Sequence, residues 1–280
     1  MSNPKVSIIM LTYDRDLFIG RAVQSVLDQK FTDWELIVVD DGTGNEAENV
    51  VRNHFKNDSR LKYFHRSRKT RIAGASNFGL AKAQGEYIAI LDDDDYWATS
   101  AKLEKQVEFL DKNVEHVGCG GGYVLIDETG REQGRYLKPE SDASIRKNAL
   151  AANSMINSTT LFRRAVAEKI GGYDESLLEF ADWDFWLKMG LRGKLYNFQE
   201  HFLYYRVWRG GASFLRQKEA ARSAFQILNR YRGEYPGSLK GFAMAVSYLL
   251  HAGLPNFVKK YSSPFFSRLK KFLFSASSPR

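Results

Sequence analysis

Cysteine is nearly absent from this chain, since Cys119 is the only one among 280 residues. One cysteine excludes an internal disulfide and favours a reducing compartment, so we expect the protein in the cytoplasm. Long apolar runs are absent too: no stretch approaches the roughly 20 residues that a transmembrane helix requires, and no signal peptide follows Met1. With 44% hydrophobic and 26% charged residues, the composition is that of an ordinary globular chain.

Acidic residues are scarce in the last part of the chain. Residues 216–280 contain 12 Lys or Arg but only two acids, a net charge of +10, whereas residues 1–215 carry −2. Residues 255–274 have the pattern of an amphipathic helix, with Phe and Leu on one face and basic side chains on the other. This segregation favours peripheral contact with an anionic membrane, at the inner face of the cell membrane, over nucleic-acid binding. For residues 214–251, docking on the rest of the chain is an equally good interpretation.

Strand-like and helix-like segments alternate along the first half of the chain. This order is typical of βαβ units, and it predicts an α/β fold with a mostly parallel sheet flanked by helices. A later strand, residues 117–126, contains five small residues at 118–122, which we interpret as close packing because their spacing does not fit a dinucleotide-binding loop. The expected strands are 6–11, 34–39, 61–64, 87–91, 117–126, 157–162, 195–198 and 202–207; the expected helices are 17–29, 45–56, 74–83, 101–110, 165–170 and one starting near 182.

Four adjacent carboxylates, Asp92 to Asp95, end the apolar run Tyr87–Leu91. Residues 88–91 carry no polar side chain, as expected of a strand that is covered on both faces. Four acids at the end of such a strand repel one another, so they favour a cation with oxygen ligands at this position. A solvated acidic turn before a helix is the alternative interpretation.

Other polar side chains follow the neighbouring strands. Asp40 and Asp41 end the strand at 34–39, and Thr12, Tyr13 and Asp14 end the first strand. Because the carboxyl ends of parallel strands meet at one edge of a sheet, we expect these residues to face the same pocket as the four aspartates. Because these polar residues share one edge, a binding site is a better interpretation of the four aspartates than a solvated acidic turn.

Five motifs in order resemble those of the family 2 glycosyltransferases, which are inverting enzymes with a GT-A fold. The resemblance covers roughly residues 4–213 and implies a nucleotide-sugar-binding and catalytic domain over residues 1–213, with a helical, basic extension at 214–280. The motif of processive polysaccharide synthases is absent, which indicates a transferase that adds single sugars. The motifs are VSIIMLTY (6–13), ELIVVDDGT (35–43), GASN with Gly79 (74–79), GEYIAILDDDDYW (85–97) and DWDFW (182–186).

The resemblance implies a UDP-sugar donor. Similar enzymes hold the uracil and ribose with the loop after the first strand and the acid pair after the second. A carboxylate can accept the ring N–H of uracil, and an aromatic side chain can stack on the base. Arg71 is placed to approach the base or the diphosphate. The residues that match these roles are Thr12, Tyr13, Asp14 or its neighbour Arg15, Asp40 and Asp41.

The same resemblance assigns roles to the aspartate cluster. Asp92 and Asp93 are expected to face the ribose and the sugar, and Asp94 to bind Mn²⁺ or Mg²⁺ directly. The cation bridges the phosphates and offsets the charge that grows on the departing UDP. Asp95 is expected to cap the following helix or brace the loop.

The general base of the family is matched by Asp182, with Asp184 as a second candidate, because inversion needs a carboxylate opposite the leaving group. Two departures from the family pattern concern this site: Ala181 replaces a Glu, and Trp208 stands where relatives often carry a His. Arg206 is therefore expected to supply positive charge near the diphosphate. Trp183 is expected to line the acceptor site or the core.

The sequence thus predicts transfer of one sugar from a UDP-sugar to a hydroxyl of a saccharide or lipid-linked acceptor, in surface polysaccharide or lipopolysaccharide synthesis. Two alternatives stay open. A sugar-phosphate nucleotidyltransferase also uses an α/β sheet and metal-binding acids, although its Gly-rich loop is missing after the first strand. A non-catalytic nucleotide-sugar-binding protein would tolerate the departures at Ala181 and Trp208.

Overall fold

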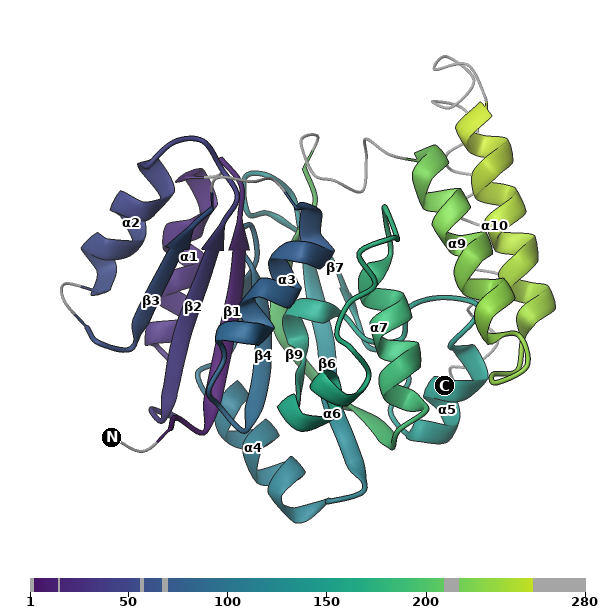
Figure 1. Cartoon of the computed structure of the whole chain (residues 1–280), viewed down its shortest axis with the longest axis horizontal. Helices are drawn as coiled ribbons and strands as arrows, with labels where there is room; N and C mark the ends of the chain where they lie inside the picture. The colour runs from purple at the N-terminus through teal and green to yellow at the C-terminus, as the bar shows by residue number, and fades with distance from the viewer. Residues whose placement is uncertain (1–2, 15, 56–57, 67–69, 209–216, 254–280) are drawn as a thin grey trace.

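The fold is a single twisted sheet with helices on both faces (Figure 1). The computed structural model describes residues 3–14, 16–55, 58–66, 70–208 and 217–253, so the predicted membrane-binding segment at 255–274 lies outside the described residues. The first half of the chain forms β1 (Val6–Thr12), α1 (Asp16–Leu27), β2 (Trp34–Asp40), α2 (Glu46–Phe55), β3 (Leu61–His65), α3 (Arg71–Lys82), β4 (Tyr87–Asp92), β5 (Tyr96–Trp97) and α4 (Lys102–Lys112).

The first four strands pair in the order β3-β2-β1-β4, all parallel, as the alternation of strands and helices predicts. Both faces of β1, β2 and β4 are buried over nearly their whole length, whereas β3, at the edge of the sheet, is only partly buried. In β1, Ile8 and Met10 pack with the core under α1, α2 and α4, and Ile9 packs with the opposite core under α3. Two cores therefore cover β1, β2 and β4, which accounts for their continuous apolar runs.

The second half of the sheet is mixed. Its elements are β6 (His116–Ile126), β7 (Glu132–Tyr136), α5 (Asp142–Asn148), η1 (Asn157–Thr159), β8 (Leu161–Arg163), α6 (Arg164–Lys169), α7 (Ala181–Gly190), β9 (Lys194–Arg206), α9 (Gln217–Tyr231) and α10 (Ser238–Gly253). β8 pairs antiparallel with both β4 and β6, and β6 pairs parallel with β9. The predicted α/β class with a mostly parallel sheet is confirmed; the antiparallel pairs lie in the second half, beside the parallel pair of β6 and β9.

Three local expectations were wrong. The expected strand at 157–162 begins instead as the turn η1, because the hydroxyls of Thr159 and Thr160 donate back to the carbonyls three residues earlier, at 2.7 and 2.6 Å. The two expected strands at 195–198 and 202–207 are one strand, β9, whose register with β6 shifts around Gly121–Gly122. Helix α5 was not predicted from the sequence.

The small residues of β6 serve close packing, as expected. A Cβ added at Gly120 would lie 2.7 Å from Oδ1 of Asn197, and one at Gly121 would lie 2.6 Å from the ring of Phe202. β6 and β9 form the most extensively paired strands of the sheet, so these glycines let the neighbouring layers approach them.

Helices α9 and α10 pack on the rest of the described chain (Figure 1). Asp184 of α7 is completely buried and accepts hydrogen bonds from Nη1 of Arg230 at 2.6 Å and Oη of Tyr231 at 2.9 Å. The same Arg230 nitrogen lies 2.8 Å from Oδ2 of Asp174, in the loop before α7. Tyr235 donates to the carbonyl of Leu187 at 2.8 Å. For this part of the extension, docking on the domain is confirmed.

We expect Arg230→Met to destabilise the protein. The substitution removes a donor that two carboxylates share and leaves Asp184 buried with Tyr231 and Lys188 as its remaining partners. Because half of the Arg230 side chain faces solvent, we expect a loss of about 2 kcal/mol, below the full cost of breaking a buried pair. Thermal unfolding measures it, with exposed Arg222→Met on the same helix as the matched control. Equal melting temperatures for the two variants would contradict the role of Arg230.

Lys102 is completely buried at the start of α4. Its Nζ donates to Oε1 of Gln106 at 2.7 Å and lies 4.3 Å from the ring centroid of Trp97. Gln106 in turn donates to the carbonyl of Thr159, so Lys102 and Gln106 connect α4 to η1. Burial lowers the pKa of Lys102 to about 7, because a charged ammonium loses its hydration there.

The buried ammonium predicts a pH dependence of stability. The unfolded chain keeps the Lys102 proton up to about pH 10.5, whereas the folded chain releases it near pH 7. Between these values the unfolded state binds more protons, so the contribution of Lys102 to the free energy of unfolding rises with pH. We expect Lys102→Met to flatten this rise in urea unfolding measured from pH 7 to 10. Exposed Lys105→Met is the control, and identical slopes for wild type and Lys102→Met would refute the prediction.

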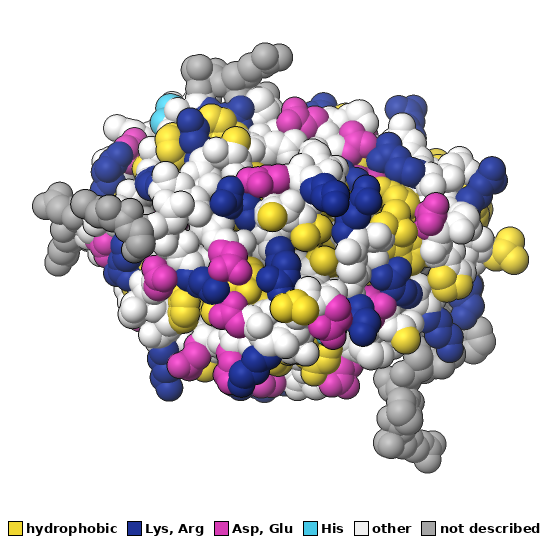
Figure 2. All heavy atoms as spheres, turned by 60° about the horizontal axis from the view of Figure 1, so that its bottom comes forward, with side chains coloured by type: hydrophobic (Ala, Val, Ile, Leu, Met, Phe, Trp, Pro, Cys, Tyr) yellow, Lys and Arg dark blue, Asp and Glu magenta, His cyan; other side chains and the backbone are white. Residues whose placement is uncertain are grey.

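No helix in the described part of the chain is long and apolar enough to span a membrane. The face shown in Figure 2 mixes acidic and basic side chains. At the edge of the sheet where β4 begins, Lys5 lies 2.8 Å from Glu86 and 2.9 Å from Asp111. Such exposed pairs contribute little to stability, and this edge of the sheet shows no concentration of one sign of charge.

Candidate active site at the carboxyl edge of the sheet

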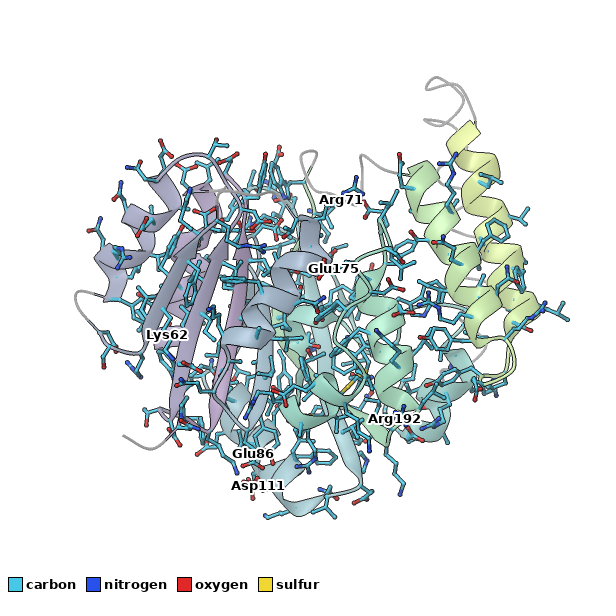
Figure 3. The ribbon with its side chains drawn as sticks, viewed as in Figure 1. Lys62, Arg71, Glu86, Asp111, Glu175 and Arg192 are labelled. Atoms are coloured by element: carbon cyan, nitrogen blue, oxygen red, sulfur yellow. The ribbon has the colours of Figure 1, made fainter. Side chains whose placement is uncertain are left out.

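The predicted shared edge exists. Thr12 lies opposite Asp40 in the register of β1 and β2, and Leu11 lies opposite Asp92 in the register of β1 and β4. The polar ends of three strands are therefore neighbours at one edge. Figure 3 shows Arg71 at this edge and Glu86 at the opposite one.

The acid pair after β2 is held by protein donors. Asp40 is buried; its Oδ1 accepts from the amide of Gly42 at 2.8 Å and its Oδ2 from Oη of Tyr63 at 2.6 Å. Asp41 accepts from the amide and hydroxyl of Thr70, at 2.9 and 3.1 Å, just before α3. Asp40 thus joins β2 to β3, and Asp41 joins β2 to the start of α3.

The loop after β1 has an unusual backbone. Asp14 has a φ of 49°, in the left-handed region, and its Oδ1 accepts from the amide of Thr43 at 2.7 Å. Arg71, the first residue of α3, also has a positive φ, of 61°. The hydroxyl of Thr12 is buried and has no hydrogen-bond partner in the described structure. Left-handed non-glycine residues and an unsatisfied buried hydroxyl are features that binding sites concentrate. The predicted contact Arg15 lies outside the described residues.

The aspartates after β4 alternate in exposure. Asp92 and Asp94 are partly exposed, whereas Asp93 and Asp95 are buried. The hydroxyl of Ser158 donates to Oδ2 of Asp92 at 3.1 Å, and the backbone amide of Asp92 donates to this Ser158 Oγ at 3.2 Å. The carboxylates of Asp92 and Asp94 are therefore both partly open to solvent, and Ser158 of η1 holds that of Asp92.

Asp95 braces the loop, which confirms one of its two expected roles; it caps no helix, because β5 follows it. Its Oδ1 accepts from the amide of Arg206 at 2.9 Å. Burial raises the pKa of Asp95 well above its usual range, and the charges of Asp94 and Asp92 raise it further. Negative charge is thus in excess around this loop.

Arg206 is buried, and its guanidinium bonds to backbone carbonyls. Its Nε donates to Asp94 O at 3.0 Å, and its Nη1 donates to Asp127 O and Glu128 O, both at 3.1 Å. The predicted role of Arg206 near the diphosphate stays a prediction; its guanidinium joins the aspartate loop to the hairpin after β6. From the sequence we expected Arg206 to supply positive charge near the diphosphate. A sequence does not show which backbone carbonyls lack a donor in the folded loops, and these carbonyls are what the guanidinium binds.

Trp208, the departure from the family pattern, contacts the predicted metal ligand. Its Nε1 donates to Oδ2 of Asp94 at 3.0 Å, and its ring packs edge-on against Phe18 at 5.6 Å. An indole N–H is a donor only, so it cannot replace a histidine as a metal ligand. It orients the Asp94 carboxylate instead.

Asp182 lies in the first turn of α7, beside a strained backbone. Phe180, which precedes this helix, has a φ of 62°. Oδ2 of Asp182 accepts from Nδ2 of Asn153 at 2.8 Å. Burial raises the pKa of Asp182, whereas the backbone amides of Asp182 and Trp183, the Asn153 amide and the charge of Lys138 lower it. The net effect is a raised pKa, because the loss of hydration outweighs the donors that favour the charged carboxylate.

Asp184, the second candidate for the base, is excluded from the site by its position. It points from α7 into the contact with α9, where Arg230 and Tyr231 bind it. Trp183 is buried and donates to Ala149 O at 2.7 Å, so it belongs to the core rather than to an exposed wall.

Tyr173 shows that the two halves of the site converge. It is buried, and burial raises the pKa of its hydroxyl; the negative charges of Asp182 and Asp92 both raise it further. Its Oη lies 3.4 Å from Oδ1 of Asn157, next to Ser158. The negative charges of Asp182, from α7, and of Asp92, from β4, thus both act on one buried phenol.

The residues at the aspartate loop fit a divalent cation that shares its ligands with a phosphate. Within the described ranges, no three His, Cys, Asp or Glu side chains form a complete metal site. Mg²⁺ typically binds through one or two carboxylates plus substrate phosphates and water, and Asp92 and Asp94 are two partly exposed carboxylates in an excess of negative charge. The chemistry of this donor set fits Mn²⁺ or Mg²⁺.

Several residues of the site were not found by sequence reasoning. Ser158 and Asn153 hold Asp92 and Asp182. Asn77 of α3 binds the loop before α7: it donates to Tyr173 O at 2.9 Å and accepts from the Tyr173 amide at 2.8 Å. Its presence in a recognised motif was a signal, but its partner lies 96 residues away. Ser158 and Asn153 carried no signal of their own.

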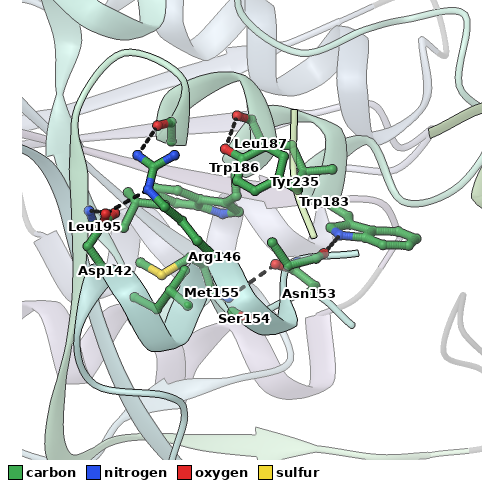
Figure 4. Close-up of a pocket in the computed structure, with 13 residues that line it drawn as sticks. Asp142, Arg146, Asn153, Ser154, Met155, Trp183, Trp186, Leu187, Leu195 and Tyr235 are labelled. Atoms are coloured by element: carbon green, nitrogen blue, oxygen red, sulfur yellow. Dashed lines mark hydrogen bonds and ion pairs between the residues drawn. The ribbon is translucent and has the colours of Figure 1, made fainter. Parts of the chain in front are cut away.

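A small cavity lies behind Asn153 (Figure 4). Its volume is about 20 Å³, and apolar side chains such as Met155, Trp186 and Leu195 line it together with Arg146. That volume holds one water molecule and no sugar. The cavity is therefore a packing defect of the core between α5 and α7, and the substrate site is the open edge of the sheet.

The fold resembles that of two solved structures, one of them a mannosyltransferase. A mannosyltransferase, PcManGT from Pyrobaculum calidifontis, solved in complex with GDP-Man and Mn²⁺, superposes with a TM-score of 0.65 at 18% identity, over 100% of this chain and 77% of that one. S. aureus TarS 1-349 in complex with UDP-GlcNAc gives 0.63 at 19% identity, over 88% and 72%. These likenesses confirm the predicted GT-A fold.

Residues 7–171 match the profile of Glycosyl transferase family 2. The putative glycosyltransferase EpsE of Bacillus subtilis is 30% identical over 77% of both chains. A Campylobacter jejuni GalNAc(5)-diNAcBac-PP-undecaprenol beta-1,3-glucosyltransferase is 29% identical over 81% of this chain and 72% of its own. An uncharacterized Haemophilus influenzae glycosyltransferase is 37% identical, but over only 47% of this chain and 52% of its own. The chain belongs to glycosyltransferase family 2, as its motifs predict.

Proposed function

We propose that the protein is an inverting, metal-dependent glycosyltransferase that moves one sugar from a UDP-sugar to a hydroxyl of a saccharide or lipid-linked acceptor. The observation that carries the proposal is the shared carboxyl edge, where the strand register places Thr12, Asp40 and Asp92 side by side and the charges of Asp92 and Asp182 both act on buried Tyr173. Helix α7 supplies the base, and the end of β4 supplies residues for the sugar donor; a single displacement requires both at one site. Membership of the family argues against a sugar-phosphate nucleotidyltransferase.

Asp182 is the general base of the proposed reaction. Its carboxylate takes the proton of the acceptor hydroxyl while that oxygen attacks the anomeric carbon of the donor sugar. The bond from this carbon to the diphosphate oxygen breaks on the opposite side, and UDP leaves with the electron pair, so the configuration inverts. Burial makes Asp182 more basic than an ordinary aspartate by raising its pKa, and its hydrogen-bond donors offset part of that rise.

The donor nucleotide is assigned to the loops after β1 and β2. The unsatisfied hydroxyl of Thr12 and the side chain of Tyr13, 37% exposed, support this position. Asp41 and Arg71 lie at the start of α3 on the same side. Asp14 and Arg15 complete the predicted set, whereas Asp40 acts through its bonds within the sheet.

Asp94 is assigned as the direct ligand of Mn²⁺ or Mg²⁺, with Asp92 and the buried Asp93 towards the ribose and sugar. A cation there supplies positive charge against the diphosphate as it departs. Trp208 and Arg206 hold the Asp94 side chain and carbonyl in place.

We expect Asp182→Asn to lower kcat by at least about 100-fold, because the near-isosteric amide cannot accept the proton. UDP release from a panel of UDP-sugars with acceptor extracts measures turnover, and NMR of the product reports the anomeric configuration. Asp182→Asn should still bind UDP. For the assigned metal ligand, Asp94→Ala should abolish the increase in turnover on addition of Mn²⁺.

Exposed Glu108→Gln on α4 is the matched control for loss of one carboxylate. Full turnover by Asp182→Asn would refute the assigned base, and a metal response that survives in Asp94→Ala would refute the assigned ligand. Absence of turnover by the wild type with any nucleotide sugar would favour the non-catalytic alternative.

A lipid-linked acceptor in surface polysaccharide or lipopolysaccharide synthesis, at the inner face of the cell membrane, fits the charge of the extension. The undecaprenol-linked name of the Campylobacter relative and the teichuronic acid name of a Bacillus subtilis relative support this class. In the described part, α10 exposes Leu239, Val246 and Leu249, which are spaced along one helical face. Residues 255–274 would add the basic, amphipathic contact.

We expect the full chain to float with liposomes that contain anionic lipid, and a chain ending at residue 254 to lose this binding. Attraction of the basic residues to anionic headgroups weakens with salt, so flotation should fall as ionic strength rises. Liposomes of zwitterionic lipid alone are the control. Equal flotation of both chains would place the membrane contact elsewhere or exclude it.

A further inference from the structure

The segment between α5 and η1 contacts the start of α7 at two adjacent residues. Trp183 donates to the carbonyl of Ala149, and Asn153 donates to the carboxylate of Asp182. Figure 4 shows Asn153 beside Trp183. The loop therefore meets the proposed base directly, although 29 residues separate Asn153 from Asp182.

The orientation of the Asn153 amide is set by a second hydrogen bond. Its Oδ1 accepts from the backbone amide of Met155 at 3.1 Å. A backbone N–H can only donate, so Oδ1 must face Met155 and Nδ2 must face Asp182. The side chain thus presents a donor, and not an acceptor, to the carboxylate.

Lys138 adds positive charge to the same group. Its Nζ donates to the carbonyl of Asn153 at 3.1 Å, and its charge acts on Asp182. Lys138 follows β7, so the hairpin of β6 and β7 supports the loop that holds the base. Three separate segments, at 138, 153 and 182, are joined in this way.

We propose that Asn153, supported by Lys138, is a positioning residue that orients Asp182 and keeps it deprotonated for the transfer step. The inference rests on the proposed function, because it assigns a role to the partner of the proposed base. Asn153 itself does not touch the reacting atoms. A hydrogen bond to a charged acceptor favours the ionised carboxylate over the protonated one.

The test is the pH profile of kcat/KM for Asn153→Asp. This variant is nearly isosteric and can still accept from the Met155 amide, but it places a carboxylate against Asp182. We expect the acid limb of the profile to move to higher pH, with about a tenfold loss of kcat/KM on that limb and recovery at higher pH. Asn153→Ala and Lys138→Met should move the limb in the same direction by less, and Lys138→Arg should restore it.

Asn148→Ala is the matched control, since Asn148 at the end of α5 bonds only locally, to Ser144 O at 2.9 Å. UDP binding measured by calorimetry checks that each variant keeps its donor site. A lower kcat/KM with an unmoved acid limb for both Asn153 variants would show a merely structural role and overturn the proposal. If Asp182→Asn is fully active, the proposed base itself fails; if Asp182→Asn is inactive while the Asn153 profiles match wild type, only this inference fails.

Discussion

Concentrated negative charge at one edge of the sheet is the constraint on which the site depends. β4 ends in four aspartates, and two of them face outward while two are buried. The protein holds this charge with neutral donors: Ser158 on Asp92, Trp208 on Asp94 and the Arg206 amide on Asp95. Since these donors are neutral, they leave the carboxylate charges in place, as the proposed site for a cation and a diphosphate requires.

Asp182, the proposed base, is held by the backbone of its own helix and by the contacts that anchor this helix. Asp182 sits at the start of α7, where backbone amides and the helix dipole favour a carboxylate. The loop before it is fixed by Asn77 on one side and by Arg230 on the other. The helix is therefore anchored to the donor side through α3 and to the extension through α9, so residues beyond the expected domain boundary at 213 contribute to the geometry of the base.

The departures from the family pattern acquire a physical meaning in the structure. Trp208 cannot ligate a metal, yet its indole orients the carboxylate that can. Arg206 lies beside the same loop, but its guanidinium serves carbonyls of the aspartate loop and the hairpin. Position in a motif identified which residues gather at the site; it did not distinguish those that face a ligand from those that support them.

The sequence by itself determined the α/β class, the strands that end in Thr12, Asp40 and Asp92, and the placement of Asp182 at a helix start, because apolar periodicity and motif order are local properties of the chain. It did not determine the turn at 157–159, helix α5, or the partners Ser158, Asn153 and Tyr173. Those contacts join residues tens of positions apart, and their hydrogen bonds exist only once both segments are packed. Packing also decides that Asp184, two residues from the proposed base, is buried against Arg230 while Asp182 bonds to Asn153, since side chains two positions apart in a helix point to nearly opposite sides.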